Sequence, residues 1–485
     1  MILSLANELL HRIVSLLELD DLKRTRFTCK HLNYIVTPLV LEHVALNLND
    51  EVLFPVSMSL LQSLGSPRDN PGQYIKSLRI NSSFDPPYSR YLGFWDKVAN
   101  RRARVTSLIA TRLLEAIPSL DFYRHSLSSF FGFRQGGFST LEVNAVMSRF
   151  SKLPHLSTIS IILHTDTVHE PFFSHFHNLR DITFNGHRIL DVIPSVIASS
   201  PDVYRLDLVN FSAPNTAFPL VRNIFPSLPS ATYRPVEHLS IEGQFLLPPS
   251  DVTFLIPHLR LLASLQIHIA NVPEQFWTAL RTEKIFLQHI SVVMIDDALL
   301  EYLGSYSGIM TLSLTFTQSE SDARGRRFWK MVLPKHVKTI KELFVHPNTP
   351  GEWCLNDGAL RILTRCENLE ILRVIVDQDR VDVKGPDNII TRLLECLRRW
   401  EHLQSLFILS AHDPNDFGGS ALLPSYKTCR RIQKLITEYQ CCHPTEGMLR
   451  LAVATDYAES VLVRRELEID VFSFLATQSW AIGSC

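Results

Sequence analysis

A short pattern of apolar positions recurs along most of the chain: apolar, two other residues, apolar, one other residue, apolar. The first clear copy is Ile75-Leu78-Ile80, and a weaker last copy is Met448-Leu451-Val453. The copies between them begin at Leu156, Leu179, Val203, Val236, Leu262, Leu287, Ile309, Ile340, Leu369 and Leu403. The last two apolar positions of each copy alternate with other residues, which is typical of a strand with one buried face. The pattern therefore predicts a series of short, half-buried strands.

The spacing of the copies predicts a repeat. Successive copies begin 22 to 33 residues apart between Leu156 and Ile309, and later steps grow to 45 residues. Leucine-rich repeats have a period of roughly 20–29 residues, and the longer steps leave room for a full helix. Helical spacing appears between strands, as in Ile390-Leu393-Leu394-Leu397, and Asp297 and Asn356 are expected to start capped helices. Strand-turn-helix units cannot bury their apolar side alone, so they stack.

The predicted fold class is therefore α/β, with a short all-α segment ahead of an irregular leucine-rich-repeat solenoid. Parallel strands are expected on the concave side and helices outside. We place the helical domain at residues 1–45 and the repeat arc at 46–465. Insertions are expected near 82–104 and 124–140, and 466–485 is expected to cap the last repeat.

The first 45 residues follow a different pattern. Apolar residues recur at helical spacing and form one stripe, at Leu9, Leu10, Ile13, Leu16 and Leu17. Asp20 and Asp21 are expected to end this helix and begin the next, while Leu22, Phe27 and Cys29 supply a second apolar face. Thr37-Pro38 predicts the start of a further short helix, because proline suits a first turn. About forty residues hold too little core to be stable alone, so this piece must pack on the chain or on a partner.

The same residues resemble an F-box. Leu5-Ala6-Asn7-Glu8-Leu9-Leu10 is followed by Ile13, Leu16-Leu17, Asp21-Leu22 and Cys29-Lys30. Ala6 stands where the family favours proline, and Leu32 stands near its usual tryptophan. The resemblance implies a helical hook that binds a Skp-type linker protein and, through it, a cullin-based ubiquitin ligase. The residues expected to bind the linker are Leu5, Glu8, Leu9, Leu10, Ile13, Leu16, Leu17, Leu22, Cys29 and Leu32.

The chain as a whole resembles the F-box proteins with leucine-rich repeats that are common in fungi. This resemblance implies a non-catalytic substrate-recognition subunit of an SCF-type ubiquitin ligase, with an unidentified protein target on the repeats. An alternative is a repeat scaffold that is not coupled to ubiquitination. In that case the N-terminal helices would cap the solenoid and bury the same leucines internally. Exposure of the first-helix stripe discriminates between the two.

Composition narrows the partners and the compartment. The 48 Lys and Arg residues nearly balance 49 Asp and Glu residues, so no long-range field favours nucleic acid or an acidic membrane. No apolar run is long enough for a membrane span, and polar residues interrupt the N-terminus before any signal-peptide cleavage site. Eight scattered cysteines favour reduced thiols in the cytoplasm or the nucleus.

Candidate catalytic chemistry is sparse. The stretch from Gly304 to Gly308 has Tyr306 where a nucleophile elbow needs serine, so a loop is the better interpretation. His175 and His177 alternate, but no cysteine or carboxylate cluster completes a metal site. The basic clusters at 101–104 and 324–327 are open to three interpretations: a nuclear-import patch, a phosphate-binding site or a solvated face. We expect no cofactor, no metal and no enzymatic activity.

Overall fold

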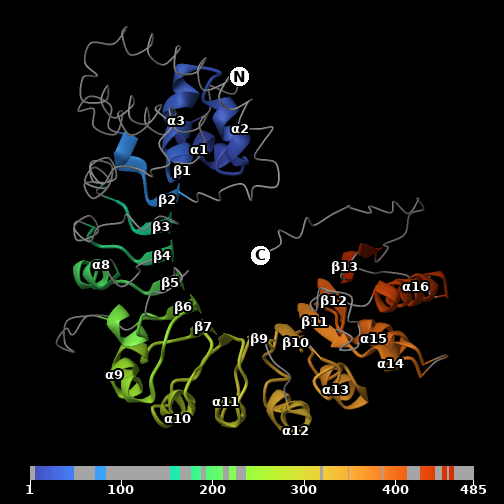
Figure 1. The fold of residues 1–485 in the computed structure, drawn as a ribbon. Coiled ribbons are helices and arrows are strands. Elements are labelled where there is room, and N and C mark those ends of the chain that lie inside the picture. The colour runs from blue at the N-terminus through green and yellow to red at the C-terminus, as the bar shows by residue number, and fades with distance from the viewer. Residues whose placement is uncertain are drawn as a thin grey trace, which may run out of the picture. The chain divides into compact units, whose positions relative to one another are not determined.

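The computed structural model describes the chain as two compact units. Unit 1 comprises residues 1–217 and 223–234, and unit 2 comprises 218–222 and 235–485. The described residues are 6–47, 71–82, 153, 155–163, 176–186, 193–210, 218–225, 236–316, 321–347, 349–383, 385, 387–411, 426–442, 450–455 and 458–463. Figure 1 draws them as coloured ribbons. The predicted capping segment at 466–485, the first basic cluster, His175 and the predicted insertions (apart from Ser82) lie outside these residues.

Unit 1 begins with three helices and continues as parallel strands. The helices are α1 (Asn7–Val14), α2 (Leu19–Thr25) and α3 (Lys30–Leu41), with α8 (Ile193–Ser199) later in the chain. The strands are β1 (His43–Asn47), β2 (Ser77–Ser82), β3 (Thr158–Leu163), β4 (Asp181–Gly186) and β5 (Arg205–Asn210). Each strand pairs in parallel with the next, from β1 to β5. A 3-10 turn at Pro71–Tyr74 precedes β2.

The boundaries of the N-terminal helices differ from the prediction at two places. Helix α1 ends at Val14, so Asp20 and Asp21 do not terminate it but lie in the first turn of α2, where negative charge suits the helix dipole. The separate helix predicted to start at Thr37 does not form, since α3 continues to Leu41 with Pro38 inside it. Pro38 has no N–H to donate to the Tyr34 carbonyl, so α3 continues to Leu41 without that hydrogen bond.

The apolar residues predicted as strand centres form a continuous ladder in unit 1. Leu78 pairs with Ile159, Ile159 with Ile182, and Ile182 with Leu206. All four are at most 2% exposed, so the ladder is the core of this sheet. The ladder also has a rung that the prediction missed, because Val44 of β1 pairs with Leu78.

Unit 2 repeats the same arrangement over more strands. The parallel strands are β6 (His238–Gly243), β7 (Ser264–His268), β8 (His289–Val292), β9 (Thr311–Thr315), β10 (Glu342–His346), β11 (Ile371–Val376), β12 (Ser405–Ser410) and β13 (Arg450–Thr455). Strand β14 (Ala458–Val463) is antiparallel to β13 and was not predicted. The helices are α9 (Val252–Leu255), α10 (Glu274–Thr282), α11 (Asp297–Gly304), α12 (Asp322–Arg327), α13 (Asp357–Leu363), α14 (Gln378–Val381), α15 (Ile389–Cys396) and α16 (Tyr426–Cys442).

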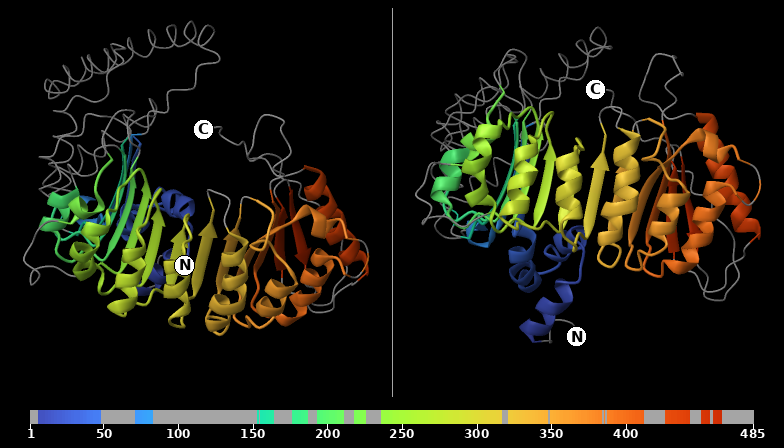
Figure 2. Two further views of the ribbon diagram at one scale, coloured as in Figure 1. Left: turned by 60° about the horizontal axis from the view of Figure 1, so that its bottom comes forward. Right: turned by 90° about the horizontal axis from the view of Figure 1, so that it is seen from below.

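The helices of unit 2 lie along one side of its strands (Figure 2). The strand residues that face the helices are buried, and the alternate residues are half-buried. We call the side of the strands β6 to β12 away from the helices the open face. Strand-helix units stacked in this way form a leucine-rich-repeat solenoid, so the predicted α/β fold class is confirmed.

Most of the predicted pattern is confirmed in unit 2 as well. The ladder runs through Leu239, Leu265, Ile290, Leu312, Leu343, Leu372 and Leu406. It then departs from the prediction, because Leu406 pairs with Val453 and not with Leu451. Helix α15 carries the predicted apolar spacing, and Asn356 caps α13 by accepting a hydrogen bond from the Ala359 N–H at 2.9 Å.

Helix α11 starts one residue earlier than predicted. Its cap is Asp296, whose Oδ1 accepts from the Leu299 N–H at 2.6 Å, and Asp297 is the first helical residue. Both carboxylates favour the amino end of a helix, so the sequence alone did not distinguish them. Within the described residues, no helix has the length and apolar character that crossing a membrane requires.

Candidate functional site

Helix α1 has two apolar sides with different environments. Leu10 and Val14 are 2% and 3% exposed, and they pack with Leu22 of α2 and with Ile35 and Val36 of α3. These five residues form one small core that holds the three helices together. Because Leu10 and Val14 are four residues apart, they lie on the same side of the helix, one turn from each other.

The other apolar side of α1 is exposed. Leu9 is 50% exposed and Ile13 is 42% exposed, again one turn apart. Leu16, just after the helix, is 83% exposed. We call Leu9, Ile13 and Leu16 the helical surface. Soluble monomers seldom expose neighbouring large apolar side chains without a binding role, so this surface is a candidate contact for a partner.

The charged residues of the N-terminal helices pair locally. Lys23 lies 3.0 Å from Asp20, and Arg24 lies 3.7 Å from Asp21, both within α2. The hydrogen bond and positive charge of Lys23 lower the pKa of Asp20. These pairs leave α2 nearly neutral, and they do not cover the apolar side chains of α1. Recognition at the helical surface is therefore expected to depend on apolar contact and shape.

The structure sorts nine of the ten predicted linker-binding residues into three groups. Glu8 is exposed along with the helical surface, whereas Leu17, Cys29 and Leu32 are half-buried. Leu10 and Leu22 are buried, so their assignment to a contact surface is corrected to a place in the core. An apolar stripe that includes both Leu9 and Leu10 is wide enough for one edge to face the core and the other to face solvent. The apolar pattern alone does not show which edge is buried. Leu5 lies outside the described residues.

Cys29 has a structural role that the prediction did not assign. It is the N-cap of α3, and its Sγ accepts a hydrogen bond from the Leu32 N–H at 3.5 Å. Phe27, predicted to be part of the second apolar face, is 84% exposed, and Tyr34 on α3 is 73% exposed. The neighbouring Arg26 guanidinium lies 5.8 Å from the Phe27 ring. Phe27 and Tyr34 are thus further exposed aromatic side chains of the same helical domain.

The open face of unit 2 is a second candidate surface. On β6 to β9 it carries polar side chains, and hydrogen bonds link some of them from β7 to β8 and from β8 to β9. His268 bonds with the Ser291 hydroxyl at 2.8 Å, and His289 bonds with the Thr311 hydroxyl at 3.0 Å. Burial lowers the pKa of both histidines, so both are neutral at physiological pH. On β10 to β12 the same face becomes aromatic and apolar, as described below.

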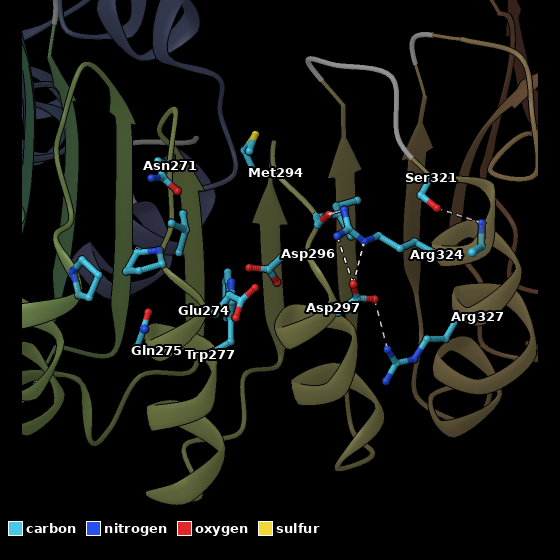
Figure 3. A pocket seen from close by; sticks show the side chains of 15 residues that line it. Asn271, Glu274, Gln275, Trp277, Met294, Asp296, Asp297, Ser321, Arg324 and Arg327 are labelled. Atoms are coloured by element: carbon cyan, nitrogen blue, oxygen red, sulfur yellow. Dashed lines mark hydrogen bonds and ion pairs between the residues drawn. The ribbon is translucent and has the colours of Figure 1, made fainter.

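A pocket lies at one edge of unit 2, where strands end and helices begin. It has a volume of about 830 Å³ and is lined by the loops that precede α10, α11 and α12 (Figure 3). Its polar lining includes Asn271, Glu274 and Asp296, and Trp277 forms part of the wall. Burial raises the pKa of Asp296, although the hydrogen bond from the Leu299 N–H opposes that shift.

Ion pairs between neighbouring repeats neutralise the second basic cluster at this pocket. Arg324 and Arg327 both contact Asp297, at 3.2 and 3.3 Å, as Figure 3 shows. Arg327 also lies 3.7 Å from Glu301, and Arg326 lies 4.0 Å from Glu352. Of the three interpretations of the cluster, the structure favours a solvated, ion-paired face. A phosphate would have to displace Asp297 before it could bind these arginines.

The structure brings together no set of catalytic or metal-binding residues in the part of the chain it describes. Within that part, no three histidine, cysteine or acidic side chains are placed to hold a metal ion. Tyr306, in the loop between α11 and β9, is buried, and its hydroxyl donates to the Leu287 carbonyl at 2.9 Å. It therefore belongs to the core of unit 2.

Comparisons with known proteins bear on the N-terminal helices. Residues 2–43, which include α1 to α3, match the F-box domain. No curated protein matches the chain in sequence. A solved leucine-rich-repeat protein of Leptospira interrogans is 12% identical, with 60% of this chain and 84% of that chain covered. Its TM-score of 0.24 is too low to support an inference about this chain.

Proposed function

We propose that this chain, an F-box protein whose strands and helices form a leucine-rich-repeat solenoid, is a substrate-recognition subunit of an SCF-type ubiquitin ligase. The N-terminal helices would bind a Skp-type linker protein, which connects them to a cullin. The repeats would bind a protein target. The observation that carries the proposal is the exposed apolar helical surface within a matched F-box domain.

The energetics of the helical surface are suited to docking. A fully buried leucine contributes roughly 1.5–3 kcal/mol, so side chains that begin about half exposed each gain about 1 kcal/mol when a partner covers them. Leu9, Ile13 and Leu16 begin at that level of exposure or above. The core formed by Leu10, Val14 and Leu22 holds α1 and α2 in place before binding. A preformed surface of this kind loses little conformational entropy on association.

The mechanism that we propose is proximity without catalysis by this chain. A target held on the repeats would meet the ligase at a high effective concentration, because both are attached to one protein. No bond would be made or broken by this chain's own residues. We further propose that it acts in the cytoplasm or the nucleus, where free thiols such as those of Cys354 and Cys366 persist.

A scaffold without a ligase is the second candidate, and one observation favours it. Helix α3 runs almost directly into β1, which pairs with β2, and Lys76 lies 2.9 Å from Glu42 at that junction. The N-terminal helices therefore also close the end of the sheet in unit 1. This capping role uses α3, whereas docking uses the exposed side of α1, so the two roles are separable by mutation.

Co-expression with a Skp-type linker protein, followed by pull-down, tests the proposal. The full chain should copurify with the linker, and Leu9→Asp with Ile13→Asp should abolish copurification. A matched control is Leu261→Asp with Met331→Asp, since these residues are 51% and 63% exposed in unit 2 and the charge change is the same. The control pair should copurify like the unmodified chain.

Circular dichroism of each variant shows whether it is folded. Failure of the unmodified, folded chain to bind the linker would leave the scaffold as the better account. Equal loss of copurification in the control pair would show that the effect is not local to α1, and would also count against docking through that helix.

A further inference from the structure

Three side chains on adjacent strands form a stack on the open face of unit 2. Phe344 on β10 lies opposite Arg373 on β11, which lies opposite Phe407 on β12. The guanidinium carbon of Arg373 is 5.2 Å from the centre of the Phe344 ring and 4.7 Å from the centre of the Phe407 ring. Cation–π attraction on both sides holds the planar guanidinium in a fixed place. We call these three residues the arginine sandwich.

Arg373 has no counter-ion among the described residues. It forms no ion pair there, and its buried Nε has no hydrogen-bond partner. Glu342 lies on the same face of β10, two residues before Phe344, and is not within ion-pair distance of Arg373. By contrast, Arg324 and Arg327 are paired with Asp297. A half-buried guanidinium without an acidic partner is costly, and an external anion would offset that cost.

The charge of Arg373 persists despite its position. Burial lowers its pKa from the usual 12.5, but arginine remains charged at physiological pH in proteins. The half-buried Phe344 and Phe407 lie on the strands on either side of Arg373, and the N–H donors of the guanidinium lie in its own plane, at its edge. A planar guanidinium edge suits the two oxygens of a carboxylate, which it binds with two parallel hydrogen bonds.

The surroundings of the sandwich favour a single negative charge over a phosphate. From β9 to β12 the described open face holds no second lysine or arginine. Phosphate recognition generally uses several basic groups, and nucleic acid needs more still. Ile371 and Leu409 flank the sandwich on the same face, so apolar side chains of a ligand would also find contacts there.

We propose that the open face of β10 to β12 binds an acidic segment of a partner protein. Arg373 binds one Asp or Glu side-chain carboxylate of that segment, and Phe344 and Phe407 contact the apolar residues beside it. A chain-terminal carboxylate fits less well, because capture of a terminus uses free backbone N–H groups, and those of the inner strands are engaged in the sheet. The proposal deepens the proposed function by naming the chemistry of the target, although the binding itself needs no ligase.

Arrays of synthetic peptides test this site directly. Each ten-residue peptide is acetylated and amidated, with apolar flanks and a central glutamate, glutamine or phosphoserine. The full-length chain should prefer the glutamate peptides over the glutamine peptides by about tenfold, the value of one charge-assisted pair. Arg373→Gln should remove this preference, and Arg373→Lys should weaken it, because lysine lacks the planar fork. Arg365→Gln is the matched control: it removes one positive charge from an exposed position just after α13.

The outcomes separate this site from the helical surface. Equal binding of glutamate and glutamine peptides by the unmodified chain would overturn the proposal, and this comparison needs no variant to fold. Binding of phosphoserine peptides alone would also overturn it, in favour of a phosphopeptide. All arginine variants should still copurify with the linker protein. Conversely, the Leu9→Asp, Ile13→Asp variant should lose linker binding but still prefer glutamate peptides over glutamine peptides.

Discussion

Leu9 and Leu10 are neighbours on α1, yet Leu9 is 50% exposed and Leu10 is 2% exposed. One contributes to the helical surface, and the other packs against Leu22, Ile35 and Val36. The same apolar stripe therefore supplies both core side chains that hold the N-terminal helices together and the exposed side chains of the helical surface. A docking role and a sheet-capping role would not exclude each other, because the exposed apolar side chains lie on α1, whereas α3 is the helix that leads into β1.

Truncating these two leucines should have different effects. Leu10→Ala removes a core side chain and should destabilise the N-terminal helices by about 2–5 kcal/mol. Leu9→Ala should cost less than about 0.5 kcal/mol, because its side chain already meets solvent. Hydrogen exchange of the α1 amides measures both changes. Equal acceleration of exchange in the two variants would contradict the division into core and surface.

Replacing the adjacent residues Asp296 and Asp297 at the start of α11 should lower the unfolding free energy by different amounts. Asp296 caps the helix through the Leu299 N–H, so Asp296→Ala should cost about 1 kcal/mol of unfolding free energy. Asp297 is exposed and forms surface ion pairs with Arg324 and Arg327, so Asp297→Ala should cost less than about 1 kcal/mol. Urea unfolding of the full chain measures both costs. Asp296→Asn is the control, since the amide oxygen still accepts and most of the stability should remain.

The repeat was predictable because each strand needs the same three buried positions. Leu78, Ile159 and Ile182 are the middle apolar residues of their copies of the pattern, and they pair with one another in register. Parallel pairing keeps the same position of each copy in line. The segment that forms β1 has the same spacing, at Leu41, Val44 and Leu46, and Val44 pairs with Leu78. The prediction gave residues 1–45 to the helical domain and placed a short helix from Thr37 to Leu41, whereas α3 spans Lys30–Leu41 and β1 follows it at His43.

The candidate sites were less predictable because they depend on which neighbour a side chain meets. Periodicity identifies the stripe on α1 but not which leucines pack inward, since that depends on α2 and α3. The pairing of Arg324 with Asp297 joins residues 27 positions apart, and no local pattern indicates it. The arginine sandwich depends likewise on the register of three strands, which aligns Phe344, Arg373 and Phe407.

A close approach of backbones predicts the effect of a glycine substitution in α12. A Cβ at Gly325 would lie 3.0 Å from the carbonyl carbon of Glu352 and 3.0 Å from the Trp353 nitrogen. Backbone atoms cannot move aside as a flexible side chain does, so Gly325→Ala should destabilise unit 2 by about 1–3 kcal/mol. Urea unfolding measures the change. Gly304→Ala at the end of α11 is the control, because the nearest atom to its Cβ would be a Val332 methyl at 3.9 Å.

Gly304→Ala should be neutral or stabilise the protein by up to about 1 kcal/mol, because alanine restricts the unfolded chain and favours a helix. A destabilised Gly304→Ala variant, or an unaffected Gly325→Ala variant, would contradict the packing of α12 against the segment that follows β10.

The alkaline limit of stability should depend on Tyr302. Its side chain is fully buried, donates to the Ile285 carbonyl at 2.7 Å and accepts from the Leu287 N–H at 3.1 Å. Burial raises the pKa of Tyr302 to about 12, above the ordinary value of 10.0. Below pH 10 the phenol is neutral in both the folded and the unfolded chain, so its full contribution to the unfolding free energy is present. From pH 10 to about 12 the unfolded chain releases a proton that the folded chain retains, and stability falls.

Tyr302→Phe should lower stability at neutral pH, because the Leu287 N–H and the Ile285 carbonyl both lose a buried partner, at a cost of about 1–3 kcal/mol. The same variant should lose less further stability between pH 10 and 12 than the unmodified chain does. Urea midpoints measured across this range test both expectations, and Tyr34→Phe, at a position that is 73% exposed, is the control. If the urea midpoint of Tyr302→Phe falls between pH 10 and 12 as steeply as that of the unmodified chain, Tyr302 does not cause the loss of stability. The proton that the unfolded chain releases would then come from another group.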